Sequence, residues 1–97
     1  MVIITDKEKA LDAVKKSGLK LQEVSRELKS DKEVVMAAVN QNGYALTLAC
    51  EALRSDKDVV MAAVNQNGGA IKYVCEALLE DGEFVDQLIE LLEMKKH

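Results

Sequence analysis

Proline and tryptophan are absent from this chain, and aromatic residues make up only 3% of it. Glycine, the other common turn residue, occurs five times in 97 residues. Small β-sandwiches and β-barrels depend on many tight turns and on strands rich in aromatic residues, so this composition matches them poorly. An all-helical fold agrees better with the shortage of turn residues.

Long apolar runs are missing as well. The longest of them, such as residues 34–39, extend over six residues, whereas a membrane-spanning helix needs about 20. The first residues, from Met1 to Lys7, contain neither the basic segment nor the long apolar segment of a secretory signal. We therefore expect a cytoplasmic protein that does not interact with membranes.

Residues that support metal binding or catalysis are scarce. Cys50 and Cys75 are the two cysteines, and neither has a second cysteine or a histidine at the spacing of a zinc site. The single histidine, His97, is the last residue, and we assign no role to it. The sequence contains no glycine-rich phosphate loop and no Ser/His or Cys/His pairing. We expect no metal, no cofactor and no enzymatic activity.

The overall composition is that of a folded protein. Hydrophobic residues account for 48% of the chain and charged residues for 31%, and the net charge is -4. These values lie outside the range of disordered chains, whose apolar content is too low to form a core. A chain of this length suffices for one small domain, and we predict a single domain over residues 1–97.

The most informative feature of the sequence is a repeat of 25 residues. Residues 30–54 and 55–79 are identical at 18 of 25 positions. The same frame extends with lower similarity upstream to residues 5–29 and downstream to residues 80–97. We divide the chain into an N-terminal capping repeat (5–29, the first unit), two central repeats (30–54 and 55–79, the second and third units) and a C-terminal capping helix (80–97).

Each unit is predicted to contain two short helices joined by a glycine. The first helix should begin at a hydroxyl N-cap that has an acidic residue three positions later, in the capping-box pattern or its aspartate variant. It should end at a glycine in the left-handed conformation. The expected N-caps are Thr5, Ser30 and Ser55, and the expected glycines are Gly18, Gly43 and Gly68. The second helix of a central unit should run from about residue 44 to residue 53.

Apolar residues of the second helix fall on one arc at 100° per residue, which predicts a buried face. These residues are Ala45, Leu46, Ala49, Cys50 and Leu53 in one central unit, and Ala70, Ile71, Val74, Cys75 and Leu78 in the other. The opposite arc, at positions 44, 47, 48 and 51, should face outward. Helices of this length are unstable alone, so we expect the units to stack on one another.

Both ends of the repeat array carry polar residues at positions that are apolar inside it. Val34 and Ala37 are replaced by Lys9 and Asp12 in the first unit. In the last helix the polar residues are Asp86, Glu90 and Glu93, opposite an apolar face of Phe84, Val85, Leu88, Ile89 and Leu92. Such substitutions are expected of terminal caps. We therefore predict an all-α fold, a right-handed-type αα-solenoid of three and a half helix-turn-helix repeats with about seven helices.

The repeated pattern Asp-Lys-Glu-Val-Val-x-x-Ala-Val-x-x-Asn-Gly-x-Ala-Leu resembles the repeats of the family called domain of unknown function 4116. The resemblance covers residues 5–79 and is best over residues 30–79. The chain departs from the family pattern at Met36 and Met61, where leucine is usual, and at Cys50 and Cys75, where a small hydroxyl residue is common. The resemblance implies a helical repeat and no established activity.

Two repeated polar motifs each allow two interpretations. Cys50 and Cys75 occupy one repeat position on helices that should lie about 8 to 10 Å apart, beyond disulfide range, so we interpret them as buried structural thiols rather than as a redox pair or metal site. The amides at 40–42 and 65–67 could form a ladder that binds an extended peptide. Alternatively they satisfy the helix ends and the turn, and we favour this interpretation.

Candidate contact residues come from the seven positions at which the two central units differ. Three of these positions lie on the outer arc of the second helix, where exposed apolar and aromatic side chains indicate a contact surface. Drift on a solvated face would give the same pattern. The predicted partner-binding residues are Tyr44, Thr47, Leu48, Gly69, Lys72 and Tyr73.

Charge is unevenly distributed along the chain. The net charge is +2 over residues 5–29, -1 over each central unit and -4 over residues 80–97. Solvated caps explain this gradient, although it could also promote head-to-tail association. Lys15, Lys16 and Lys20 form only a small basic patch without interleaved aromatic residues, so nucleic-acid binding is not expected.

These observations predict a non-enzymatic module that binds another protein or a peptide. A self-assembling structural protein that uses the same outer arc or its last helix is the alternative from a different class. A small inhibitor of an enzyme or a larger complex is a special case of the binding hypothesis.

Overall fold

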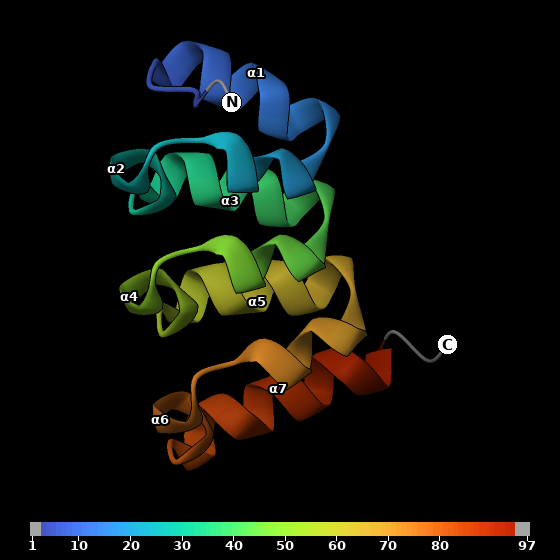
Figure 1. The fold of residues 1–97 in the computed structure, drawn as a ribbon. Coiled ribbons are helices and arrows are strands. Elements are labelled where there is room, and N and C mark those ends of the chain that lie inside the picture. Colours follow the sequence, from blue (N-terminus) through green and yellow to red (C-terminus); the bar gives the residue numbers. More distant parts are fainter. Residues whose placement is uncertain (1–2, 95–97) are drawn as a thin grey trace.

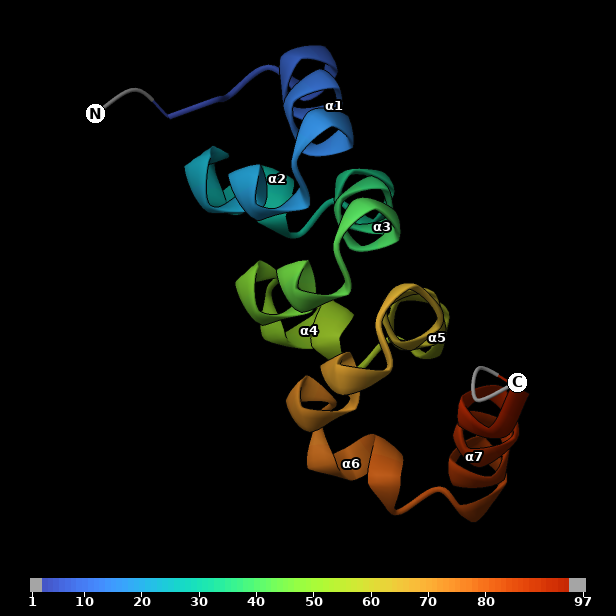
Figure 2. The ribbon, with the colours of Figure 1, turned by 90° about the vertical axis from the view of Figure 1, so that its right-hand side faces the viewer.

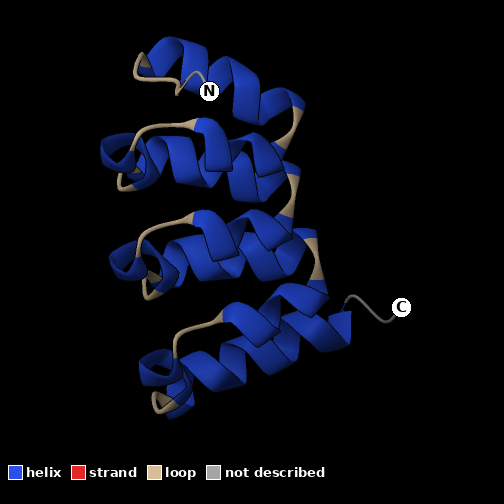
Figure 3. Cartoon of the chain, viewed as in Figure 1, coloured by secondary structure: helices blue, strands red, loops and turns tan. Residues whose placement is uncertain are grey.

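The computed structural model describes residues 3–94, which form helices joined by short loops (Figures 1 and 3). Over this range there is no strand, and an isolated bridge pairs Ile4 with Val24. The all-α class predicted from the sequence is therefore confirmed.

Four α-helices of ten to thirteen residues form one side of the molecule. They are α1 (Lys7–Lys16), α3 (Lys32–Gln41), α5 (Lys57–Gln66) and α7 (Gly82–Met94). Each of the first three is followed by a six-residue 3₁₀-helix and a four-residue α-helix. These pairs are η1 (Gly18–Glu23) with α2 (Arg26–Lys29), η2 (Gly43–Leu48) with α4 (Glu51–Arg54), and η3 (Gly68–Tyr73) with α6 (Glu76–Leu79).

The elements are arranged in successive layers. Figure 1 shows α1, α3, α5 and α7 one above the other, and the view turned by 90° in Figure 2 shows α2, α4 and α6 along the other side of the stack. Each long helix contacts the next one, and η2 contacts both η1 and η3. The buried core is therefore a stripe that runs between layers through a molecule of 40 × 28 × 18 Å.

The prediction of one continuous second helix from about 44 to 53 is wrong. Ala49 and Cys50 have extended backbone conformations that separate η2 from α4. The break directs the Cys50 N–H to the carbonyl of Lys29 in the preceding unit, at 3.3 Å. The described residues consequently contain ten helical segments, seven of them α-helices, rather than about seven in all.

The predicted core arc is largely buried despite this break. Ala45, Leu46, Ala49 and Leu53 are all buried. Cys50 and Cys75 are only half-buried, so the prediction of buried thiols is wrong. Each of them is the residue at which the chain leaves the extended break and enters a short helix, and this junction lies near the surface.

The N-caps lie one residue later than predicted. Asp6, Asp31 and Asp56, rather than Thr5, Ser30 and Ser55, accept hydrogen bonds from the first N–H groups of their helices; at α3 the Glu33 N–H donates to Asp31 at 2.9 Å. A carboxylate accepts these bonds as well as a hydroxyl does, and its charge also suits the helix dipole. Ser30 and Ser55 instead end the preceding short helices.

The repeated glycines are not left-handed, since no described residue has a positive φ. Gly18 and Gly43 are required by a close approach between units. A Cβ atom at Gly18 would collide with the carbonyl oxygen of Ala38, and one at Gly43 with that of Ala63. The chain turns at the extended residue before each glycine, for example at Ser17.

The two ends agree with most of the capping prediction. Lys9 and Asp12 are exposed, whereas Val34, the residue equivalent to Lys9 in the second unit, is fully buried. On α7, Phe84 and Leu88 are buried and the three predicted acidic residues are exposed. Ile89 is an exception to the predicted apolar face, because 48% of its surface is exposed.

Candidate protein-binding surface

The six predicted contact residues lie on two neighbouring 3₁₀-helices. Tyr44, Thr47 and Leu48 belong to η2, and the other three, Gly69, Lys72 and Tyr73, belong to η3. The two helices contact each other in successive layers, so these residues form one area, which we call the tyrosine patch. Thr47 and Lys72 are exposed, whereas Leu48 is half-buried and packs against the core.

Two tyrosines form the centre of the tyrosine patch. The rings of Tyr44 and Tyr73 meet edge to face, with centroids 5.8 Å apart and planes at 77°. This is a favourable arrangement for an aromatic pair. Each tyrosine nevertheless keeps more than a third of its surface exposed, at 37% and 38%. The pair therefore presents apolar ring surface in a fixed geometry.

Gly69 makes room for this pair. A Cβ atom at Gly69 would lie 2.6 Å from the hydroxyl oxygen of Tyr44. The residue equivalent to Gly69 in the second unit is Tyr44 itself, so the two copies differ in a complementary way: a tyrosine in one layer lies over a glycine in the next. The Thr47 hydroxyl donates to the Tyr44 carbonyl at 3.0 Å and fixes the backbone below the ring.

A hollow of about 270 Å³ adjoins the tyrosine patch, and we call it the inter-unit hollow. Its lining residues come from two consecutive units and are Glu51, Arg54, Lys72, Tyr73, Val74 and Cys75. The Nε atom of Arg54 is buried and has no hydrogen-bond partner among the described residues. Lys72 and Tyr73 belong to both the hollow and the tyrosine patch, so the two features form one continuous surface.

The hollow lies where a contact between units is not repeated. The Ser25 N–H donates to the Ile4 carbonyl at 2.8 Å, and one unit later the Cys50 N–H donates to the Lys29 carbonyl at 3.3 Å. The corresponding bond from Cys75 to Arg54 is not formed within residues 3–94. The second and third units are therefore less tightly joined at this point than the first and second units are.

Sequence reasoning found two of the six lining residues and missed Glu51, Arg54, Val74 and Cys75. A signal for two of these was present, because Arg54 and Val74 also lie at positions where the central units differ. Four of the six lining residues thus occupy the seven variable positions of a 25-residue repeat. Arg54 and Val74 were excluded because the candidates were restricted to the outer arc of a continuous helix, and that helix is in fact broken.

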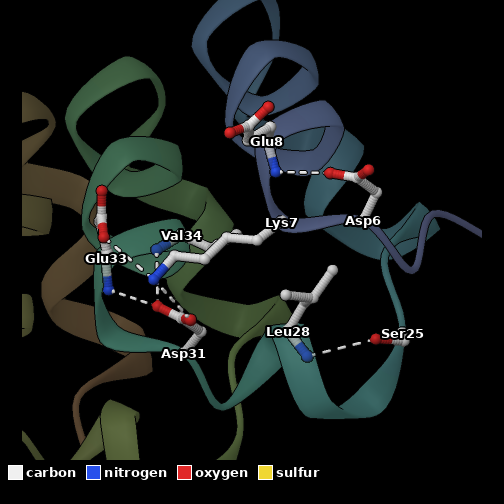
Figure 4. A network of polar contacts seen from close by, with 8 residues as sticks. All are labelled: Asp6, Lys7, Glu8, Ser25, Leu28, Asp31, Glu33 and Val34. Atoms are coloured by element: carbon white, nitrogen blue, oxygen red, sulfur yellow. Dashed lines mark hydrogen bonds and ion pairs between the residues drawn. The ribbon is translucent and has the colours of Figure 1, made fainter.

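A ladder of ion pairs joins the units on another part of the molecule and was not predicted. Lys7 contacts Asp31 at 3.1 Å and Glu33 at 3.0 Å, as Figure 4 shows. The pattern recurs when Lys32 contacts Asp56 at 3.0 Å, and again when Lys57 contacts Asp81 at 2.7 Å. In each layer a lysine at the start of one long helix binds the N-cap aspartate of the next.

This ladder shifts the pKa values of its members. The hydrogen bond from Lys57 is the main reason why the pKa of Asp81 lies below its usual range, and it raises the pKa of Lys57 in turn. Partial burial alone would raise the pKa of Asp31, but the hydrogen bonds from Lys7 and from two backbone N–H groups outweigh it and lower that pKa. The charged forms of Asp31, Asp56 and Asp81 are therefore stabilised.

The two cysteines are free thiols. A hydrogen bond with the Ser30 hydroxyl is the main reason why the pKa of the Cys50 thiol is lowered. In the part of the chain that the structure describes, no group of three His, Cys, Asp or Glu side chains could hold a metal ion.

The repeated amides at the ends of α3 and α5 make contacts that favour their structural interpretation. The Gln41 side chain accepts a hydrogen bond from the Gly18 N–H, and the Gln66 side chain accepts one from the Gly43 N–H. Asn42 accepts from the N–H of Tyr44 at 2.9 Å. Gln41 and Gln66 thus connect successive units, and Asn42 caps η2.

Comparison with known proteins gives one positive result. The model of the family described as domain of unknown function (DUF4116) matches residues 6–54 and again residues 42–79. No curated protein and no solved structure matches the chain. No helix within residues 3–94 has the length and apolar character needed to cross a bilayer.

Proposed function

The chain belongs to the family of domains of unknown function DUF4116, and we propose that this member is a non-enzymatic module that binds another protein or a peptide. Its contact surface is the tyrosine patch together with the inter-unit hollow. In this proposal the layers form an αα-solenoid of right-handed type with a 25-residue period, whose repeated contacts hold the scaffold while the surface varies.

The proposal rests on the positions at which the two central units differ. Copies that are identical at 18 of 25 positions diverge at four of the six residues that line the hollow and at the positions of both tyrosines, 44 and 73. Tyrosine and arginine are also the residue types enriched in protein interfaces.

The surface also has the physical properties of an interface. The edge-to-face contact holds Tyr44 and Tyr73 in one geometry, so little side-chain entropy remains to be lost when a partner binds. The adjoining hollow offers a concave element beside the flat ring surface. The proposed location is the cytoplasm, and the two free cysteines support a reducing compartment.

A capture experiment with the purified, immobilised chain tests this proposal. The variant Tyr44→Ser/Tyr73→Ser removes the ring surface and leaves Leu48, which contacts the core, in place. We expect proteins that the wild-type chain captures from a lysate of the source organism to be lost or reduced at least tenfold with this variant.

A matched control removes exposed apolar area elsewhere. Leu19 and Leu79 are 43% and 44% exposed and lie outside the tyrosine patch, so Leu19→Ser/Leu79→Ser should retain the captured proteins. Equal capture by wild type and by Tyr44→Ser/Tyr73→Ser would place the contact surface elsewhere. Capture no greater than that of empty resin would contradict a protein-binding role.

Self-association is a second candidate, and the exposure of Ile89 on α7 favours it. The equivalent residues Val39 and Val64 are completely buried. A second hollow, of about 240 Å³, lies between α5 and another side of α7 and is lined by Met61, Leu91 and Met94 among others. Because residues 80–97 carry a net charge of -4, association through α7 should strengthen with salt, which screens repulsion.

Light scattering over a concentration series at low and high salt tests this alternative. Association should increase with salt and be lost in Ile89→Glu. A monomer under all conditions would exclude self-association.

A further inference from the structure

We propose that the inter-unit hollow binds a carboxylate, and therefore that the partner segment seated on this surface is an acidic peptide with an apolar residue beside its acidic one. The inference rests on the proposed function and specifies the chemistry of the partner. The apolar residue would lie against the tyrosine pair, and the carboxylate would lie between Arg54 and Lys72.

The charges of the hollow carry the first step of this inference. Its lining contains two cations, Arg54 and Lys72, and one carboxylate, Glu51. Within residues 3–94 no acidic side chain lies within ion-pair distance of either cation. By contrast, Lys7, Lys32 and Lys57 are each neutralised by the ladder. The hollow is thus a basic site in an acidic protein, and its charge is complementary to an anion.

The comparison between units carries the second step. The residue equivalent to Lys72 in the second unit is Thr47, and the residue equivalent to Arg54 in the third unit is Leu79. Arg54 corresponds to Lys29 in the first unit, but Lys29 is combined there with Thr47 of the second unit, so only the junction of the second and third units brings cations at both positions together. Arg54 and Lys72 line the hollow at the junction of the second and third units. At this described junction the backbone hydrogen bond from Cys75 to Arg54 is not formed.

The chemistry of arginine carries the third step. A guanidinium group offers a planar fork of donors that matches a carboxylate, and lysine adds a mobile ammonium group. The guanidinium group of Arg54 has no ion-pair partner within residues 3–94, so its charge is available to a bound carboxylate. Because Tyr73 lines both the hollow and the tyrosine patch, one short segment can reach both parts of the surface.

Titration of the ¹⁵N-labelled full-length chain with two capped peptides tests this inference. The acidic probe is acetyl-Gly-Phe-Glu-Glu-Gly-amide, and the neutral probe has glutamine at both glutamate positions. We expect the acidic peptide to shift the backbone signals of residues 51–54 and 72–75 in a saturable manner and to bind about fivefold more tightly at low salt, as two exposed ion pairs would give. The preference should decrease at 0.5 M NaCl.

Each central unit shows a residue that the fold accepts at the equivalent position of the other unit, and the test variant uses these residues. Arg54→Leu/Lys72→Thr copies the equivalent residues of the adjacent central units and should abolish the acidic preference. Lys9→Thr/Arg26→Leu removes the same number of positive charges from the first unit and should preserve the preference. Circular dichroism melting verifies that both variants fold.

Three outcomes would overturn the carboxylate inference: equal affinity of the two peptides, no saturable shift with either, or an acidic preference that persists in Arg54→Leu/Lys72→Thr. None of them affects the proposed protein-binding role, which depends on the separate capture experiment with the tyrosine variant.

Discussion

At the residue scale, small differences in side-chain size determine how closely the layers approach. Gly18 and Gly43 each lie against a backbone carbonyl of the next layer, and a backbone atom cannot move aside as a flexible side chain can. Gly69 faces the hydroxyl end of Tyr44, and Gly82 has open space around it. The glycines of one chain therefore differ widely in how well they should tolerate a methyl group.

We predict that Gly18→Ala lowers the free energy of unfolding by about 1 to 3 kcal/mol, since overpacking against a rigid neighbour has a cost of this size. Gly82→Ala should leave stability unchanged or slightly higher, because the added methyl group meets nothing and alanine favours a helix. Urea denaturation of both variants measures the difference. Equal stabilities of the two variants would show that the close approach at Gly18 is not restrictive.

The cysteines give a second prediction at this scale. Ser25 accepts a hydrogen bond from the Leu28 N–H at 3.3 Å, whereas Cys75 makes no side-chain cap contact in the same position of its unit. Cys75→Ser should therefore stabilise the chain by about 0.5 kcal/mol, at the lower end of N-cap effects. Cys50→Ser should gain less, because the Cys50 side chain packs against the core. Thermal melts of both variants test this order, and a loss of stability in Cys75→Ser would contradict it.

At the element scale, the last helix differs from the helices before it. In α3 and α5 the equivalent valines, Val39 and Val64, are completely buried, whereas Ile89 on α7 is 48% exposed. The burial of one repeat position thus differs between units. Position within the array, rather than residue type, decides how much a side chain contributes to stability.

Val64→Ala should therefore cost about 2 kcal/mol, within the range for removing buried methyl groups. Ile89→Ala should change stability by no more than about 0.5 kcal/mol, as expected for an exposed position. Urea denaturation compares them directly. A cost for Ile89→Ala as large as that for Val64→Ala would mean that α7 is covered, for example by a second copy of the chain.

The helices, their breaks and their caps show how far the sequence could predict the fold. The helical class and most buried positions were predictable because the hydrophobic period of a sequence reports burial directly. The break at Ala49 and Cys50 was not, since neither residue is a helix breaker. Within residues 3–94 the third unit breaks at the equivalent Val74 and Cys75 without a hydrogen bond to the preceding unit, so no single contact visible in the sequence marks the break. The N-cap was misplaced because serine and aspartate are adjacent, and both are good caps.

The candidate surface was predictable in part for a similar reason. Variation between copies identified the tyrosine patch, but it could not identify the hollow, whose lining requires the broken helix and the missing bond between Cys75 and Arg54. The ion-pair ladder left a signal in the recurring Asp-Lys-Glu/Asp pattern. That signal was explained fully by helix capping, so nothing in the sequence demanded a contact between layers.

At the scale of the whole molecule, each boundary between layers of long helices contains a lysine that binds an N-cap aspartate. The pKa values of Asp31, Asp56 and Asp81 all lie below the usual 3.8. A group whose pKa is lower in the folded state stabilises that state above its unfolded pKa, and this contribution is lost as the pH falls through the folded value.

We therefore expect the urea midpoint to vary little between pH 5 and 7 and to fall below about pH 4, near the aspartate pKa of the unfolded chain. The variant Asp31→Asn/Asp56→Asn/Asp81→Asn keeps an N-cap residue at every position but loses the three ion pairs that these aspartates make. It should be less stable than wild type at pH 7 and should lose less stability on acidification. A pH dependence identical to that of wild type would exclude the ladder as its source.

The direction of this ladder also determines where the chain can be lengthened. If a further copy of residues 55–79 is spliced in after residue 79, Lys57 meets an aspartate equivalent to Asp56, and the lysine of the insert meets Asp81. At every new junction the ladder then repeats an ion pair that the molecule already has. Addition after α7 lacks this property, since Gly82 stands where the other long helices have their first lysine. The molecule is thus modular at its internal boundaries, and its length can be changed there without redesign of either end.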